Sequence, residues 1–521
     1  MTSIQARDPY TKKELEKLYV KDLRLQLVQV LHRHGERTPT VSRFQNAGLP
    51  RFWPYCSVAQ EMISQTLDNE HNPMKWTPFH WQRRIETLDK DGQPILATGP
   101  DGDVNSLCKA GELTNKGRVT TLDLGRRLRH LYVDQLDFLP KTLEDADILY
   151  LRSSSFPRAL ESLQQVVRGL YPAKTRVSSL GPLSIITRSD ADENLVPNPY
   201  NCKRLSQLST AFAQRSADRW NKTTEMQYLN KLFGKWMPKK HKSVAVDSKP
   251  RLSGIYDSIN STLAHDPGTR LPDEFYDSQG RTIIDKICVE EWFSGYQESE
   301  EYRTLGIGRL MGEIVARMIR TVESTHREKS SSRNYRDKSV SKEKAENNKL
   351  KLALNGCHDS TLAAILGSLG TLKNKTWPPY TSHIALELFR KLPVKSVSPP
   401  GIQDFNDGTE NCPEILTNFH NGPQEENDLS CHTLKNSQDS NKSKNISSLA
   451  GYFVRVRYND EVVTIPGCTQ TGNHLDGDET FCTLDAFKTI VGKYVPHSQQ
   501  KACQANLDMP AFPETPQPAG Y

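Results

Sequence analysis

A histidine flanked by two arginines forms the densest group of reactive side chains in the sequence. Arg33, His34 and Arg37 lie within five positions, in the segment RHGERTP. A guanidinium donates paired hydrogen bonds from a planar fork, so two of them suit the oxygens of a phosphate group. The neighbouring positive charges disfavour a charged imidazole, and a neutral imidazole is a nucleophile. The pattern therefore favours a histidine that attacks phosphorus over a surface loop with solvated arginines.

Two further polar segments carry residue types that the same chemistry needs. The segment RSSSFPRALES contains Arg152 and Arg158, and the pair His358-Asp359 follows the apolar run LKLALN. Another arginine adds positive charge, and a carboxyl group beside the phosphate can pass a proton to a leaving group. Arg152 is interpreted as a structural salt-bridge partner, and His358-Asp359 has a plainer alternative as a helix cap or surface pair. Cys357 is interpreted as a buried structural thiol rather than a nucleophile.

These segments together resemble a known family. Arg33–Pro39 resembles the signature of the histidine acid phosphatases, which form branch 2 of the histidine phosphatase superfamily. His358-Asp359 is similar to the family's His-Asp pair after a late strand. Arg152–Arg158 is similar to its Arg-Ser-Thr segment, with Ser154 in place of threonine. The segments LCKAGELTNKGR and LRSSSFPRALES are most similar to fungal and lysophosphatidic-acid-phosphatase-type members.

The resemblance implies a metal-independent phosphomonoesterase, an acid phosphatase, with a phosphohistidine intermediate on His34. Asp359 is then implied to protonate the leaving alcohol and afterwards to activate the water that hydrolyses the intermediate. Burial and the adjacent phosphate dianion should raise the pKa of Asp359, which favours an acidic optimum. The residues implied to bind the phosphate oxygens and spread their charge are Arg33, Arg37, Arg158 and His358.

Three apolar runs are expected to form the strands that position these segments. The runs are LRLQLVQVL at 23–31, ILYL at 148–151 and LKLALN at 350–355. Each is followed by a polar segment and then by a helical pattern, which is typical of an α/β sheet with ligands at the carboxyl ends of its strands. The loops expected to meet in one crevice are 32–39, 152–158 and 356–359.

The family implies a three-layer αβα core sheet of the phosphoglycerate-mutase type with an inserted, mainly helical cap domain. We expect an N-terminal extension at 1–22 and the phosphatase domain at 23–521, with cap insertions at about 43–105 and 175–325. Specificity should lie in the cap. The polar stretches 327–349 and 394–448 are expected to be disordered insertions, which accounts for a hydrophobic content of only 36% in 521 residues.

The net charge and the spacing of possible metal ligands limit the kinds of partner that the chain is expected to bind. Lys and Arg number 68 and Asp and Glu 62, and a net charge of +6 is too weak to indicate a nucleic-acid binder. No histidines show a spacing such as HExxH, so we expect no metal and no cofactor. The expected partner is a small phosphomonoester substrate. A transmembrane segment is not expected, because no run approaches ~20 apolar residues.

The cysteines and the N-terminus suggest a compartment. Ten cysteines are scattered without a CxxC pair, and the first thirty residues alternate acids and bases without an apolar signal run. We therefore expect reduced thiols in an intracellular protein, with the cytoplasm first and a mitochondrial location as the alternative.

A second function class stays open at this point. The same fold could bind phosphate groups as a catalytically silent regulatory module. Such a module needs only cations, so the presence of His34 and Asp359 favours the enzyme. Within the enzyme class, the substrate stays open between lysophosphatidate, an inositol phosphate, a sugar phosphate and a phosphoprotein.

Overall fold

A nine-stranded mixed sheet forms the centre of the fold, with the strand order β12-β13-β10-β9-β1-β8-β6-β7 and β11 paired with β10. The computed structural model describes residues 3–4, 7–68, 75–265, 267–331, 349–372, 376–393 and 449–521. The strands of this sheet are β1 Leu23–Arg33, β6 Leu149–Ser153, β7 Ile185–Ile186, β8 Leu352–Cys357, β9 His383–Lys391, β10 Tyr452–Tyr458, β11 Glu461–Val463, β12 His474–Leu475 and β13 Asp478–Thr483.

The pairing of β1 explains where the predicted polar loops meet. β1 runs parallel to β8, and β8 runs parallel to β6. On its other side, β1 pairs with β9 in the antiparallel sense. The carboxyl ends of β1, β6 and β8 therefore share one edge of the sheet, and the expectation that their loops converge is confirmed.

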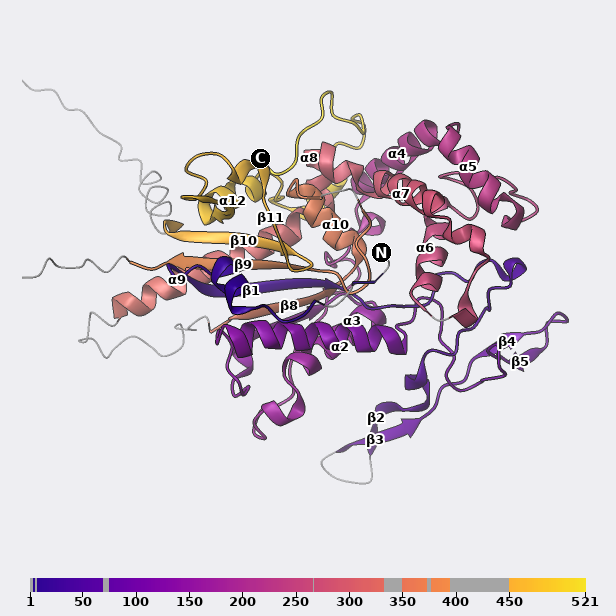
Figure 1. Cartoon of the computed structure of the whole chain (residues 1–521), viewed down its shortest axis with the longest axis horizontal. Helices are drawn as coiled ribbons and strands as arrows, with labels where there is room; N and C mark the ends of the chain where they lie inside the picture. Colours follow the sequence, from indigo (N-terminus) through magenta and orange to yellow (C-terminus); the bar gives the residue numbers. More distant parts are fainter. Residues whose placement is uncertain are drawn as a thin grey trace, which may run out of the picture.

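Helices cover both faces of the sheet, as the sequence pattern predicts (Figure 1). Alternate residues of a strand point to opposite faces. Accordingly, Val28 and Val30 lie in one apolar core with residues of α2 and α3, whereas Leu27 and Leu31 lie in another with residues of α9, α10 and α12. The helices are α2 Asn115–Arg129, α3 Pro157–Leu170, α9 Arg309–Ser331, α10 Asp359–Ser368 and α12 Leu484–Gly492.

A helical cap lies to one side of the sheet (Figure 1). The helices of the cap have an apolar core of their own. Phe44 and Trp53, from the insertion at about 43–105, also belong to this core. The same insertion contains two hairpins, β2 Met62–Asp68 with β3 Lys75–Trp81 and β4 Glu86–Leu88 with β5 Pro94–Leu96. The main cap helices are α4 Lys203–Trp220, α5 Thr224–Phe233, α6 Leu252–Leu263 and α7 Ser278–Glu298.

The structure differs from the expected divisions of the chain in two places. The interval 175–325 also contains β7 and most of α9, which belong to the core sheet and its covering layer. Helix α9 packs on β1 because its apolar stripe, which includes Leu310 and Ile314, contacts the same core as Leu31. It continues to Ser331, inside the stretch 327–349 that was expected to be disordered. Residues 332–348 and the expected insertion 394–448 lie outside the described residues.

The expectation of reduced thiols is wrong for six cysteines. Cys56 is bonded to Cys108, Cys202 to Cys503 and Cys468 to Cys482. The second bridge joins residues 301 positions apart and ties the start of α4 to α13, Gln499–Gln504. Scattered spacing gave no signal for these pairs, because folding alone brings distant cysteines together. None of the described helices is long and apolar enough to cross a membrane.

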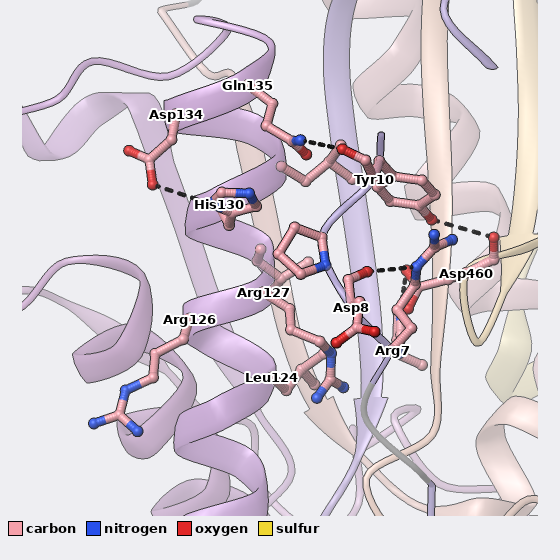
Figure 2. A pocket seen from close by; sticks show the side chains of 14 residues that line it. Arg7, Asp8, Tyr10, Leu124, Arg126, Arg127, His130, Asp134, Gln135 and Asp460 are labelled. Atoms are coloured by element: carbon pink, nitrogen blue, oxygen red, sulfur yellow. Dashed lines mark hydrogen bonds and ion pairs between the residues drawn. The ribbon is translucent and has the colours of Figure 1, made fainter. Parts of the chain in front are cut away.

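The N-terminal extension packs against the core. The Gln135 side chain donates to the Tyr10 carbonyl at 2.6 Å, and the Tyr10 hydroxyl donates to the Asp460 carbonyl at 3.4 Å (Figure 2). A cavity of about 340 Å³ lies between this segment, α2 and the turn that carries Asp460. It includes none of the residues predicted to carry chemistry.

Candidate active site

His34 follows β1 directly, and its imidazole is buried where the parallel strands end. Its backbone N–H donates to the Cys357 carbonyl at 3.1 Å, which holds it beside β8. Its Nδ1 lies 2.9 Å from the Gly35 carbonyl oxygen. A carbonyl only accepts hydrogen bonds, so Nδ1 carries the proton and Nε2 keeps its lone pair. Burial and the charge of Arg158 hold the pKa of His34 well below its usual value, so the ring is neutral.

Two glycines allow the histidine loop to touch the start of α2. A Cβ at Gly35 would lie 2.3 Å from the Gly117 carbonyl oxygen, and a Cβ at Gly117 would lie 2.2 Å from the Glu36 carbonyl oxygen. The Glu36 carbonyl also accepts from the backbone N–H and the hydroxyl of Thr114, at 3.0 and 3.1 Å. The LTNKG segment therefore fixes the loop against α2.

Arg33 is held by three contacts. Its Nη2 lies 2.7 Å from Oδ2 of Asp359, and its Nη1 donates to the Pro378 carbonyl at 2.7 Å. Its guanidinium carbon lies 4.0 Å from the centroid of the Tyr380 ring, within range of a cation–π interaction. These contacts orient the guanidinium before a substrate arrives.

Arg37 is held by the cap rather than by the core alone. Its Nη1 donates to the Thr38 carbonyl at 3.0 Å, and its Nη2 lies 2.8 Å from Oδ1 of Asp257 in α6. Asp257 also accepts from the backbone N–H and hydroxyl of Thr40, at 2.9 and 3.0 Å. A carboxylate that the sequence did not single out thus joins the site.

Arg158 is the second residue of α3 and brings a third guanidinium to the site. Its guanidinium carbon lies 4.7 Å from the Phe156 ring centroid. Among the described residues, no carboxylate lies within 4.0 Å of it. Burial and the nearby charge of Arg37 lower the pKa of Arg158 to about 10, so it stays charged in neutral and acidic solution.

His358 faces His34 across the site, with the ring centroids 5.5 Å apart. Its Nε2 lies 2.8 Å from the Ser154 hydroxyl, which follows β6. Burial and Arg158 lower the pKa of His358 to about 3, so this ring is also neutral. Ser154 stands where the family usually has threonine, and its hydroxyl supplies the contact, so the exchange keeps the hydrogen bond.

Asp359 begins α10, and its carboxylate accepts three hydrogen bonds. Arg33 and the indole N–H of Trp377 contact Oδ2 at 2.7 and 2.9 Å, and the Ser360 N–H donates to Oδ1 at 2.8 Å. Burial by itself raises the pKa of Asp359, but Arg33 and Trp377 outweigh it and leave the value at about 2. The pKa of Asp359 therefore lies below its usual value in the protein alone, whereas the raised pKa is expected for the complex with phosphate.

Two alternative interpretations of neighbouring residues are settled by burial and contacts. Arg152 is fully buried and pairs with Glu193 at 2.8 Å and Glu313 at 3.1 Å, which confirms a structural salt-bridge role. Cys357 is buried, and burial raises the pKa of its thiol to about 12. A thiol that stays protonated is not a nucleophile, and Cys357 lies in the apolar core with Leu27 and Leu31.

The six predicted residues therefore meet at one edge of the sheet. Three residues that complete their surroundings, Asp257, Trp377 and Tyr380, were missed. The segment WPPYTSH before β9 offered a signal, because aromatic residues and prolines there precede a buried strand. Nothing around Asp257 offered one. The described residues contain no group of three or more His, Cys, Asp or Glu side chains placed to hold a metal ion.

The chain is similar to known proteins in its sequence and in its fold. A model of the histidine phosphatase superfamily (branch 2) matches residues 24–404. The chain is 35% identical over 489 residues to a probable acid phosphatase of Schizosaccharomyces pombe, which covers 93% of this chain and 95% of that protein. It is 24% identical over 378 residues to lysophosphatidic acid phosphatase type 6 of Homo sapiens, which covers 72% and 76%. Among solved structures, a phytase of Hafnia alvei in complex with tartrate is similar with a TM-score of 0.50 and 13% identity, covering 93% and 99% of the two chains. This last likeness concerns the fold alone.

Proposed function

The chain belongs to branch 2 of the histidine phosphatase superfamily and hydrolyses phosphomonoesters, and we propose that it does so through a phosphohistidine on His34. One observation carries this proposal. The hydrogen bond between Nδ1 of His34 and the Gly35 carbonyl leaves the Nε2 lone pair free, among three arginines. In the first step, Nε2 forms a bond to phosphorus while the bond from phosphorus to the ester oxygen breaks.

The transferring phosphoryl group is stabilised by three arginines from two parts of the chain. Arg33 ends β1, Arg37 lies in the loop after it, and Arg158 is the second residue of α3. Fixed positive charge in a buried site stabilises the negative charge that the phosphoryl oxygens carry in the transition state. His358 is neutral, so one of its two ring nitrogens carries a proton that it can donate to a phosphate oxygen.

Asp359 supplies the proton for the leaving alcohol. In the unliganded site this carboxyl group is ionised, because Arg33 and Trp377 hold its pKa at about 2. A bound phosphate dianion pairs with the same arginines and adds negative charge beside Asp359, and both changes raise its pKa. Asp359 then takes a proton from solution, and the reaction speeds up in acid. In the second step, the ionised carboxylate activates the water that hydrolyses the phosphohistidine.

The phosphate charge is met by arginines in this scheme, so we propose that hydrolysis needs no metal ion. A silent phosphate-binding module is not favoured, because binding alone makes no use of a free Nε2 lone pair or of Asp359. The direct test is hydrolysis of p-nitrophenyl phosphate at about pH 5 with a chelator present, for the wild type and for His34→Ala. Activity that survives the substitution rejects the phosphohistidine, and trapping of acid-labile phosphate on His34 supports it.

We further propose a phosphomonoester with an apolar leaving alcohol as the substrate. Beside Asp359, the Trp377 ring packs against Phe293 and Trp292 with centroids 4.8 and 6.0 Å apart, and Trp292 is 46% exposed. An exposed aromatic surface near the acid suits an alkyl chain better than a ring of hydroxyls. Lysophosphatidate, the compound in the name of the human relative, has such a group. A panel comparing it with inositol and sugar phosphates tests this, and Trp292→Ala should lower the preference.

The disulfides bear on the compartment. Such bonds form and persist in oxidising compartments and are rare in the cytoplasm. We therefore propose that the chain folds in an oxidising compartment, in place of the cytoplasmic location expected from the sequence. Thiol titration of the purified protein tests this: Cys288 and Cys357 are the buried free thiols among the described cysteines. Titration of more than four thiols under denaturing, non-reducing conditions contradicts it, because Cys412 and Cys431 add only two to that pair.

A further inference from the structure

Asp257 is a carboxylate with a side chain only 15% exposed, and it faces a site for anions, where a negative charge needs an explanation. It lies in cap helix α6, and the loop after β1 provides its partners. Its Oδ1 is 2.8 Å from Nη2 of Arg37, and its Oδ2 accepts from the backbone N–H and hydroxyl of Thr40 at 2.9 and 3.0 Å. Arg43 approaches Oδ2 at 3.9 Å. The contacts with Arg37 and Thr40 join the cap to the segment that carries His34.

The contacts of Arg37 show what Asp257 does. Nη1 of Arg37 is fixed by the Thr38 carbonyl and Nη2 by Asp257, while Nε is buried and has no hydrogen-bond partner among the described residues. A guanidinium is a planar fork, so two fixed nitrogens define both its position and its plane. Removal of Asp257 leaves the Thr38 contact on Arg37's own loop and the Tyr380 ring, whose centroid lies 5.7 Å from the guanidinium carbon. Only one nitrogen then stays fixed, so rotation of the guanidinium becomes easier.

Charge also argues for a role other than substrate contact. A carboxylate repels a phosphate dianion, so its presence near the site weakens binding unless it improves the geometry of a cation. Arg37 and the hydrogen bonds from Thr40 outweigh burial and lower the pKa of Asp257, so the group is ionised when it pairs with Arg37. Arg37, Arg43 and Arg158 are the cations whose charges interact with it.

We propose that Asp257 is a positioning residue that holds the guanidinium of Arg37 in the plane that binds phosphate, and that links the cap to the histidine loop. The proposal rests on the phosphomonoesterase function above, because it assigns Arg37 to the substrate phosphate. It gives the cap a part in phosphate binding in addition to its expected part in specificity.

The test compares Asp257→Asn with the wild type and with Arg37→Gln. A hydrogen bond to a charged group contributes an amount that corresponds to about a tenfold to hundredfold change, so we expect kcat/KM for p-nitrophenyl phosphate to fall by about that factor. The double variant should be no worse than Arg37→Gln alone, because Asp257 acts through Arg37. Asp257→Glu, which keeps the charge, should recover part of the loss.

Two controls separate positioning from general damage. Asp218 is an exposed cap residue on α4, and Asp218→Asn should leave kcat/KM and the melting temperature unchanged. The loss in Asp257→Asn should be equal for an aryl and an alkyl phosphomonoester, because Arg37 binds phosphate and not the leaving group. A defect in proton donation would instead be larger for the alkyl ester, as in Asp359→Asn.

Titration calorimetry with inorganic phosphate gives a readout that does not depend on the phosphohistidine. The proposal predicts weaker phosphate binding in Asp257→Asn, by about tenfold or more. Tighter binding would show that Asp257 acts only as a repulsive neighbour and would overturn the proposal, as would multiplicative losses in the double variant. Activity retained in His34→Ala would reject the phosphohistidine mechanism. The effect of Asp257→Asn on phosphate binding would still test the role of Asp257 separately.

Discussion

Replacement of Gly117 by alanine tests the contact between α2 and the histidine loop. The new Cβ would lie 2.2 Å from the Glu36 carbonyl oxygen, 2.7 Å from the Glu36 backbone nitrogen and 2.6 Å from Cδ1 of Leu113. Two of these atoms belong to the backbone, so a side-chain rotation cannot relieve the clash. Cβ contacts below 3.0 Å are essentially never seen, so loop and helix must separate by at least about 0.8 Å.

That separation should affect catalysis more than folding. The displaced loop carries His34 and Arg37, and a misplacement of about 1 Å at reacting groups costs roughly a hundredfold in rate. Overpacking of this kind destabilises a protein by about 1–3 kcal/mol. We expect Gly117→Ala to fold with a lowered melting temperature and to lose about a hundredfold in kcat/KM for p-nitrophenyl phosphate.

The matched control is Gly492→Ala at the end of α12. A Cβ there has no atom within 4 Å, so the change should leave activity intact and should not lower the melting temperature. Wild-type activity and stability in Gly117→Ala would refute the reasoning, because the loop would then not be set by its approach to α2.

Three further predictions concern pH, the disulfides and the second histidine. Glu387 is buried between arginines, and these outweigh burial and lower its pKa to about 2, so the unfolded chain binds the extra proton. The ionised Glu387 therefore stabilises the folded protein above its usual pKa, and this contribution is lost as pH falls towards 2. Acid unfolding monitored by circular dichroism should show this loss. Glu387→Gln should flatten the dependence of stability on pH. Reduction of the bridge between Cys202 and Cys503 should lower stability by roughly 2–5 kcal/mol in denaturant titrations, and an unchanged midpoint after reduction would argue against the bridge. Ser154→Ala removes the hydrogen bond to His358 and should lower kcat/KM by about twofold to tenfold, whereas Ser154→Thr should match the wild type.

The sequence was sufficient for the parts of the site that follow directly from strands. Arg33 and His34 stand at the end of an apolar run, and His358 stands at the end of another. Since parallel strands end at one edge, their order along the chain already places these residues together.

The remaining parts depend on contacts that no local pattern encodes. Asp257 reaches Arg37 across more than two hundred positions, from a helix whose sequence resembles any amphipathic cap helix. The disulfide from Cys202 to Cys503 has the same character. The boundary near α9 was misjudged because an apolar stripe reports that a helix is packed, but not which layer it packs on.

The charge of the unliganded site shows why the pKa of Asp359 could not be inferred from burial. Burial raises the pKa of a carboxyl group, yet Arg33 contacts this one at 2.7 Å and reverses the direction. Arg37 is paired in the same way with Asp257, whereas Arg158 has no carboxylate within 4.0 Å among the described residues. An incoming phosphate therefore binds Arg158 without competing with a carboxylate, and it competes with Asp359 for the guanidinium of Arg33. Release of Asp359 from Arg33 is what allows it to take a proton, so substrate binding itself prepares the acid.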